Sequence, residues 1–167
     1  MDYTHFKEIV DEVKRKNPHL FELEHDQILS MTEIDIIEKK MNIRLPQDYR
    51  RFISEFGGGF FGYAIVYSLD ENSCFYMFQD APLVQKGYLP KEYLPVFDNG
   101  CGDIYVLKIY ERQCLDEVYF FNHERMSVAK TKFTNILEYL VEVGLKQDIE
   151  MGGCSSLRNS MVKLYDF

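Results

Sequence analysis

The sequence predicts an α+β domain, in which an antiparallel sheet of five or six strands is covered on one face by N-terminal helices and a C-terminal helix. Helical periodicity is confined to residues 4–56 and 131–144, whereas the stretch between them is extended and rich in aromatic and β-branched side chains. Because the strands follow one another instead of alternating with helices, hairpins are expected to connect them. A chain of 167 residues favours a single domain over 1–167.

Composition describes a folded, acidic protein. Hydrophobic residues make up 46%, with 12 Tyr and 13 Phe, which argues against disorder. The net charge of −8 repels phosphate groups and therefore disfavours a nucleic-acid binder or a protein of anionic membrane surfaces. Residues 59–129 hold 10 acidic and 5 basic residues. This excess favours solubility or, alternatively, forms an acidic face that steers a basic partner.

Cysteine usage and the N-terminal sequence predict a cytoplasmic protein. The four cysteines (Cys74, Cys101, Cys114 and Cys154) match neither redox nor zinc-ribbon spacings and are expected to be free thiols. The first residues lack the apolar core of a signal peptide, and no apolar run is long enough to cross a membrane.

The first predicted helix covers residues 4–15, where apolar residues recur at i, i+3, i+4 and i+7 from Phe6. It ends at Asn17 because the residue before Pro18 avoids the α region. Residues 19–29 are expected to form an irregular connection.

Two further helices are predicted before the glycines at 57–59. Thr32 is expected to cap the first of them, with Asp35 at the N3 position of a capping box and Asn42 as a left-handed stop. Pro46 suits the first turn of the next helix, which ends at its C-cap, Gly57. The apolar face of that helix comprises Tyr49, Phe52, Ile53 and Phe56.

Six extended segments follow. They are residues 60–68, 73–78, 94–97, 104–110, 117–121 and 127–130. The third and fourth flank Asn99-Gly100, a strong hairpin signal because both residues tolerate positive φ. Residues 79–93, with two prolines and a glycine, are expected to form a loop.

The chain then returns to helix. Apolar residues recur with helical spacing from Phe133 to Val141, with Thr131 as the expected cap and Gly144 as the stop. For the last 20 or so residues, a short docked helix from about Ser156 is favoured over a mobile tail.

Several stretches match chemical motifs only in part. Residues 57–62 spell G-x-G-x-x-G, but they end a helix and begin a strand, the reverse of a dinucleotide site. Residues 98–103 place glycine where a calcium loop needs ligands, so a tight turn is preferred. His123 and Glu124 could form a catalytic pair of a base and the residue that orients it. Cys101 could be a nucleophile, but no basic residue adjoins it to lower its pKa. No catalytic residue, metal site or cofactor is predicted.

Residues 32–58 resemble the SUKH superfamily, whose domain is shared by a yeast cell-wall regulator and many bacterial proteins. The signature residues are Leu45, Pro46, Tyr49, Phe52, Gly57 and Gly58. Later pieces are similar in the same order, namely Leu94-Pro95-Val96-Phe97 with Gly102-Asp103, residues 118–124 and residues 133–137. The resemblance covers residues 30–141, so the first helix and the C-terminal segment are either specificity elements or plain extensions. It assigns the signature a scaffold role.

The resemblance implies a non-catalytic protein that binds and neutralises a cognate toxin, often a nuclease, by stoichiometric association. The acidic middle segment would suit a basic toxin. The candidate contact residues are the hairpin carboxylates Asp98, Asp103, Glu111, Asp116 and Glu117. The alternative, suggested by the eukaryotic relatives, is a regulatory scaffold that binds several proteins of its own cell. An enzyme acting through Cys101 or His123 is the third hypothesis.

Overall fold

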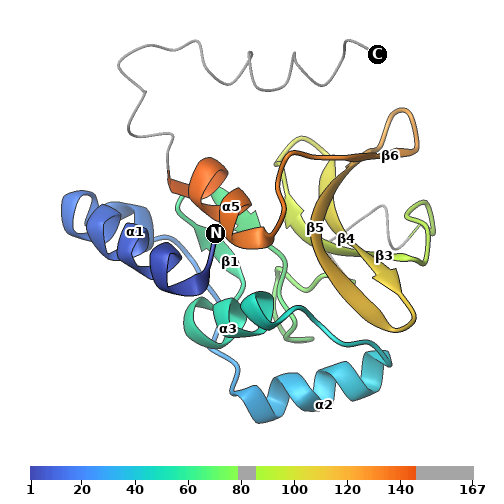
Figure 1. Ribbon diagram of the computed structural model, residues 1–167, viewed down its shortest axis with the longest axis horizontal. Helices are drawn as coiled ribbons and strands as arrows, with labels where there is room; N and C mark the ends of the chain where they lie inside the picture. Colours follow the sequence, from blue (N-terminus) through green and yellow to red (C-terminus); the bar gives the residue numbers. More distant parts are fainter. Residues whose placement is uncertain (79–85, 146–167) are drawn as a thin grey trace.

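The computed structural model describes residues 1–78 and 86–145, and it has the predicted α+β architecture. The helical segments are α1 (Tyr3–Lys16), η1 (Pro18–Phe21), α2 (Met31–Met41), α3 (Gln47–Phe56), α5 (Ile136–Tyr139) and η2 (Leu140–Leu145), the last a π-helix. The strands are β1 (Gly59–Phe61), β2 (Ala64–Val66), β3 (Tyr93–Asp98), β4 (Ile104–Tyr110), β5 (Gln113–Asn122) and β6 (Ser127–Lys130). In Figure 1, α1, α3 and α5 gather on one side of β3, β4 and β5, with α2 below them.

The six strands form one antiparallel sheet in the order β1-β2-β3-β4-β5-β6, so each strand pairs with its neighbours in the chain. This confirms the fold class and the strand number, but two of the predicted strands were wrong. The segment predicted at 60–68 is split, because Gly62 adopts φ 57° and turns the chain between β1 and β2. Residues 73–78 are turns that touch Ser68 through an isolated bridge at Tyr76.

The helix boundaries correct one predicted cap. Ser30, not Thr32, caps α2, and its capping-box partner is Glu33 rather than Asp35. The predicted cap was two residues too late, because Ser30-Glu33 and Thr32-Asp35 both have the spacing of a capping box. Thr32 and Asp35 lie within the helix. Asn42 ends α2 with φ 57°, as predicted.

The third helix begins and ends close to the predicted positions. Pro46 is the N-cap of α3 rather than a residue of its first turn, and Gly57 ends the helix with φ 74°. Glycine is required here because an added Cβ would lie 2.9 Å from the carbonyl oxygen of Asp26. Asp26 belongs to the connection before α2, which therefore crosses directly over the glycines.

This connection also covers the outer edge of β1. The N–H of Phe60 donates to the carbonyl of Glu24 over 2.9 Å, and the N–H of Asp26 donates to the carbonyl of Gly58 over 3.0 Å. His25 pairs with Gly59 in an antiparallel bridge. The irregular connection predicted at residues 19–29 thus covers the outer edge of the sheet and satisfies hydrogen-bonding groups there.

The C-terminal helix is shorter than predicted. Asn135 caps α5 by accepting from the N–H of Glu138, whereas Thr131 bonds the carbonyl of Val118. Gly144 is not a stop but lies inside η2, where its carbonyl accepts from the N–H of Tyr63 over 3.0 Å. The helix proposed near Ser156 lies outside the described residues.

The hairpin between β4 and β5 turns on Glu111 and Arg112, with φ 48° and 66°. No glycine or asparagine marks this turn in the sequence, so β5 was predicted from residue 117 although it begins at Gln113. The Asn99-Gly100 turn does connect β3 and β4, and the N–H of Cys101 donates to Asn99 Oδ1 over 2.8 Å.

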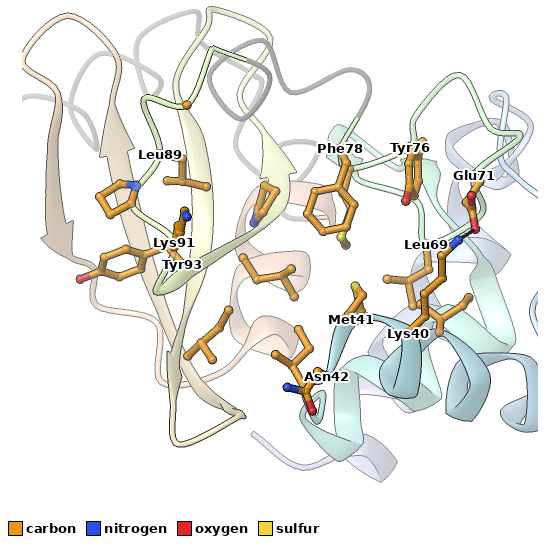
Figure 2. Close-up of a pocket in the computed structure, with 18 residues that line it drawn as sticks. Lys40, Met41, Asn42, Leu69, Glu71, Tyr76, Phe78, Leu89, Lys91 and Tyr93 are labelled. Atoms are coloured by element: carbon orange, nitrogen blue, oxygen red, sulfur yellow. Dashed lines mark hydrogen bonds and ion pairs between the residues drawn. The ribbon is translucent and has the colours of Figure 1, made fainter.

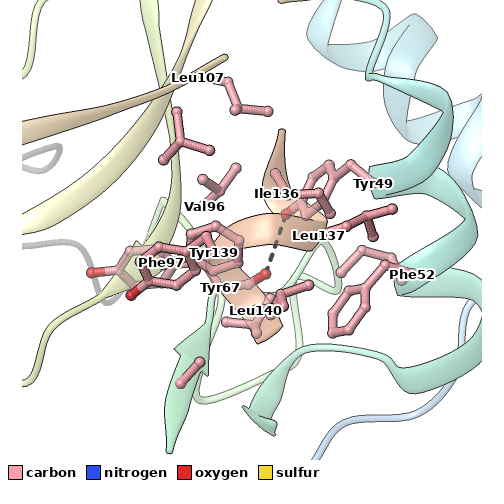
Figure 3. Close-up of a cluster of buried hydrophobic side chains, with 14 of the residues drawn as sticks. Tyr49, Phe52, Tyr67, Val96, Phe97, Leu107, Ile136, Leu137, Tyr139 and Leu140 are labelled. Carbon is pink, nitrogen blue, oxygen red and sulfur yellow. Dashed lines mark hydrogen bonds between the residues drawn. The ribbon is translucent and has the colours of Figure 1, made fainter. Parts of the chain in front are cut away.

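Aromatic rings dominate the core between helices and sheet. Phe6, Phe52, Phe56 and Phe61 join α1, α3 and β1, with ring centroids 5.0–6.2 Å apart. Across the sheet, Tyr139 of α5 stacks on Phe97 of β3 with centroids 4.2 Å apart (Figure 3). Burial raises the pKa of Tyr139 well above its ordinary value, so this side chain stays neutral. The described residues share one hydrophobic core; a single domain over the whole of 1–167 stays a prediction.

Candidate functional site: an apolar groove beside a basic pocket

A groove of about 710 Å³ opens between the C-terminal half of α2, residues 69–78 and the segment leading into β3. Its apolar lining includes Ile37, Met41, Leu69, Met77, Leu89 and Leu94. Figure 2 shows these elements facing one another across it. A concave apolar surface of this size is typical of a binding site.

The groove is framed by local features of the sequence. The apolar stripe of α2 is wide enough that Ile34 packs in the core while Ile37 and Met41 remain partly accessible. At the rim Lys40 pairs with Glu71, and this hydrogen bond raises the pKa of the lysine. Tyr76 and Phe78 are in edge-to-face contact with centroids 5.6 Å apart. Methionine and aromatic side chains adapt readily to a partner's surface.

A second pocket, also of about 710 Å³, lies on the other side of Asn42 and Ile43, which line both cavities. We call it the basic pocket, because its lining contains Lys39, Arg44, Arg50 and Arg112. The acidic side chains in it are Asp35, Glu38 and Glu111.

Arg50 and Glu38 form the floor of the basic pocket. Glu38, only 7% exposed, accepts from the N–H of Leu45 over 2.6 Å and lies 3.8 Å from the Arg50 guanidinium. Arg50 also pairs with Asp35, while its Nε is buried with no partner among the described residues. A buried carboxylate thus joins α2, the Leu45-Pro46 connection and α3.

The signature residues are scaffold. Leu45, Tyr49 and Phe52 are at most 4% exposed, and the Tyr49 hydroxyl donates to the carbonyl of Tyr67 (Figure 3). Pro46 is buried beside them. Gly58 has no room for a side chain, since a Cβ would lie 2.7 Å from Ser68 Cα. These positions determine where the two cavities lie without lining either one.

The candidate carboxylates Asp98 and Asp103 flank the β3–β4 turn and accept hydrogen bonds within the protein. Asp98 Oδ2 accepts from the Tyr67 hydroxyl over 2.8 Å. Asp103 Oδ1 accepts from the N–H of His123 over 2.9 Å and lies 2.7 Å from its Nδ1. The sequence suggested pairing His123 with Glu124, but its partner is Asp103, because the pairing of β4 with β5 brings the residue before β4 close to the residue after β5.

The other three candidates lie elsewhere. Glu111 is in the β4–β5 turn, at the opposite end of β4 from Asp103 and so about 26 Å away along the strand. Glu117 pairs with Lys130 over 2.6 Å. Asp116 is exposed as a residue, but its carboxyl group is partly desolvated. This desolvation, together with the nearby Asp48 carboxylate, raises the pKa of Asp116. The five carboxylates therefore do not form one patch, although Glu111 lines the basic pocket.

We expect Asp116→Asn to stabilise the protein by about 0.5 kcal/mol or less at neutral pH, because it removes a charge that folding disfavours. A raised folded-state pKa means that the penalty appears as pH rises through that pKa and is absent well below the unfolded value. Urea unfolding at neutral pH and near pH 3 should show a gain only at neutral pH. In an Asp48→Asn background the gain should shrink; destabilisation at neutral pH would contradict this account.

Within residues 1–78 and 86–145, no three His, Cys, Asp or Glu side chains are grouped to hold a metal ion. Cys101 is exposed in the β3–β4 turn, whereas burial raises the pKa of the Cys114 thiol to about 12. Among the same residues, the helices are all too short or too polar to span a bilayer.

Sequence reasoning missed both cavities. Their lining comes from α2, the residue 43–44 connection, residues 69–78 and the β4–β5 turn, which only the tertiary fold brings together. One local signal was available: the apolar stripe of α2 is wider than one core-facing side requires, and Ile37 and Met41, which extend it, line the groove.

Comparison with known proteins gives a consistent result. The family described as SMI1-KNR4 cell-wall, SUKH_6, matches residues 31–140. A crystal structure of a protein from Pseudomonas syringae pv. tomato has a similar fold, with a TM-score of 0.62 and 16% identity over 84% of this chain and 99% of the other. No curated protein matches significantly. Because the family match spans most of the chain and includes the Leu45-Pro46 signature and the sheet, the protein belongs to the SUKH_6 family, described as SMI1-KNR4 cell-wall.

Proposed function

We propose that this protein is an immunity-type binding protein, which neutralises a cognate protein toxin by stoichiometric association. The observation that carries the proposal is the apolar groove, of about 710 Å³, on a strongly charged molecule of the SUKH_6 family. Exposed apolar concavities of soluble proteins are typical of interaction sites. The resemblance of residues 30–141 to bacterial immunity proteins supplies the class of partner.

The test begins with the neighbouring gene. If it encodes a large secreted protein with a toxic C-terminal domain, that domain is expressed in a sensitive host with and without this chain. Growth rescue together with a 1:1 complex by light scattering is the expected result. Rescue lost on Phe78→Ser, but kept on Ile36→Ser outside the groove, would tie protection to the groove. A toxin that kills equally in both strains would contradict the proposal.

The net negative charge of the protein predicts a salt-sensitive association with a basic partner. The exposed carboxylates Glu111 and Asp116 are the contact candidates to test, because Asp98 and Asp103 are used within the fold. Reversing both charges to Lys should slow association about tenfold at low salt, with the dissociation rate changed less. The measurement is stopped-flow association at about 0.02 M and about 0.5 M salt.

The matched control is Glu8→Lys on the exposed face of α1, far along the chain from both hairpins. It changes the net charge by the same sign but not the proposed contact surface. The acidic-contact hypothesis would be rejected if the association rate did not change with salt concentration and if charge reversal at Glu111, Asp116 and Glu8 changed it equally.

A second candidate function is a regulatory scaffold, favoured by the cell-wall description of the matching family. It predicts several partners from the protein's own cell rather than one toxin. Affinity capture from the native cell, quantified against Phe78→Ser, separates the two: one dominant groove-dependent partner supports immunity, and several support the scaffold.

A further inference from the structure

The apolar groove and the basic pocket meet at the end of α2. Asn42 and Ile43 line both cavities, so the two cavities adjoin at this corner. Asn42 is exposed and holds this corner in a left-handed conformation with φ 57°. The two cavities therefore lie next to each other, with an apolar lining on one side of Asn42 and a charged lining on the other.

Three cations of the basic pocket are not neutralised internally. Lys39, Arg44 and Arg112 are exposed, and none has a carboxylate within 4.0 Å in the part of the chain that the structure describes. By contrast, Arg50 is paired with Asp35 and Glu38. In a protein with a net charge of −8, a local group of unpaired cations is a departure from the general surface.

The fold holds the backbones of two of these residues, Arg44 and Arg112, side by side. The N–H of Arg44 donates to the carbonyl of Arg112 over 2.7 Å, and the N–H of Cys114 donates to the carbonyl of Arg44 over 2.8 Å. Arg44 thereby pairs with Gln113 in a parallel bridge. Because these hydrogen bonds fix the backbone at both arginines, less backbone entropy is lost when the two residues bind a ligand.

The turn that presents Arg112 is also strained. Glu111 and Arg112 both have positive φ in a two-residue hairpin turn, where asparagine and glycine are strongly preferred. A non-glycine residue in this region costs on the order of 1 kcal/mol. The fold thus carries a conformational cost at the position where an arginine enters the pocket, as expected when its guanidinium is used for binding.

We propose that the groove and the basic pocket together bind one segment of the partner protein, in which apolar side chains are followed by an acidic residue. The apolar side chains enter between α2 and β3, and the carboxylate binds the guanidinium groups of Arg44 and Arg112. Arginine forks match carboxylates in a bidentate geometry. The nearby acidic groups Glu111 and Asp35 disfavour a multiply charged phosphate and so favour a single carboxylate. This inference rests on the proposed function, because it names the part of the partner that is recognised.

The test uses the full-length protein as bait and a phage-displayed library of random peptides of about twelve residues, long enough to span both cavities when extended. Enriched sequences should carry two or more large apolar residues followed by Asp or Glu. Their synthetic copies should bind Arg44→Glu or Arg112→Glu about tenfold more weakly, and replacing the acidic residue by Lys should have the same effect.

Two variants control the charge and the groove. Arg15→Glu reverses an exposed cation on α1, outside the pocket, and should leave peptide binding unchanged. Phe78→Ser should weaken binding without altering the preference for an acidic residue. Selection of no consensus, of peptides without acidic residues, or of peptides that bind the two arginine variants normally would overturn the inference.

The outcomes also separate this inference from the proposed function. If a toxin is neutralised by Arg44→Glu and Arg112→Glu as well as by the unaltered protein, the immunity function stands and the docking surface is rejected. If the peptides behave as expected while no toxin is neutralised, the docking surface stands and the proposed function fails.

Discussion

Gly62→Ala is expected to prevent stable folding, or to lower the free energy of unfolding by about 3 kcal/mol or more. A Cβ on Gly62 would lie 2.0 Å from the carbonyl oxygen of Gly144, which is backbone and not free to rotate away. That carbonyl also accepts the N–H of Tyr63 over 3.0 Å, so separating the two segments loses a hydrogen bond. The β1–β2 turn and η2 depend on this close approach.

Gly100→Ala is the matched control, because Gly100 has φ 73° but the nearest atom to an added Cβ is Ile65 Cδ1 at 3.9 Å. It incurs the left-handed strain alone, about 1 kcal/mol. Urea unfolding followed by circular dichroism compares the two variants. If both lose the same stability, the steric conflict with Gly144 is not the cause and the account of this contact fails.

Glu38→Ala is expected to cost about 3–5 kcal/mol, because it leaves buried partners behind. The N–H of Leu45 loses its acceptor at 2.6 Å, and Arg50 keeps only Asp35 while its Nε already has no partner. Both losses fall on the connection that carries the Leu45-Pro46 signature. The basic pocket should therefore lose its shape together with the stability.

Glu38→Gln provides the comparison, since the amide oxygen can still accept from Leu45 while the charge facing Arg50 is removed. We expect it to recover a substantial part of the lost stability, measured as the difference between denaturant midpoints at constant slope. A glutamine variant as unstable as the alanine variant would show that the charge, and not the hydrogen bond to Leu45, is the essential contribution.

Local patterns determined a large part of this protein. The stop at Asn42, the C-cap at Gly57 and the Asn99-Gly100 turn follow from the conformations that these residues prefer, and they are where the structure has them. The ordered pieces between residues 30 and 141 also pointed to the SUKH superfamily, which the family match at residues 31–140 supports. The cap of α2 was misplaced because Ser30-Glu33 and Thr32-Asp35 are both acceptable capping pairs.

Other features were decided only by tertiary contacts. The division of residues 60–68 into β1 and β2 depends on the Gly62–Gly144 approach, between residues 82 positions apart. The pairing of His123 with Asp103 depends on the register of β4 and β5. The Glu111-Arg112 turn has no local signal, since neither residue favours positive φ.

The sequence by itself therefore determined the secondary-structure order, the fold class and the family, because these depend on residue preferences repeated over short distances. The tertiary structure alone decided the groove, the basic pocket and the dispersal of the five candidate carboxylates. The physical reason is that a cavity is formed by side chains from distant segments. Their proximity depends on packing and strand register, for which a single stretch of sequence carries no signal.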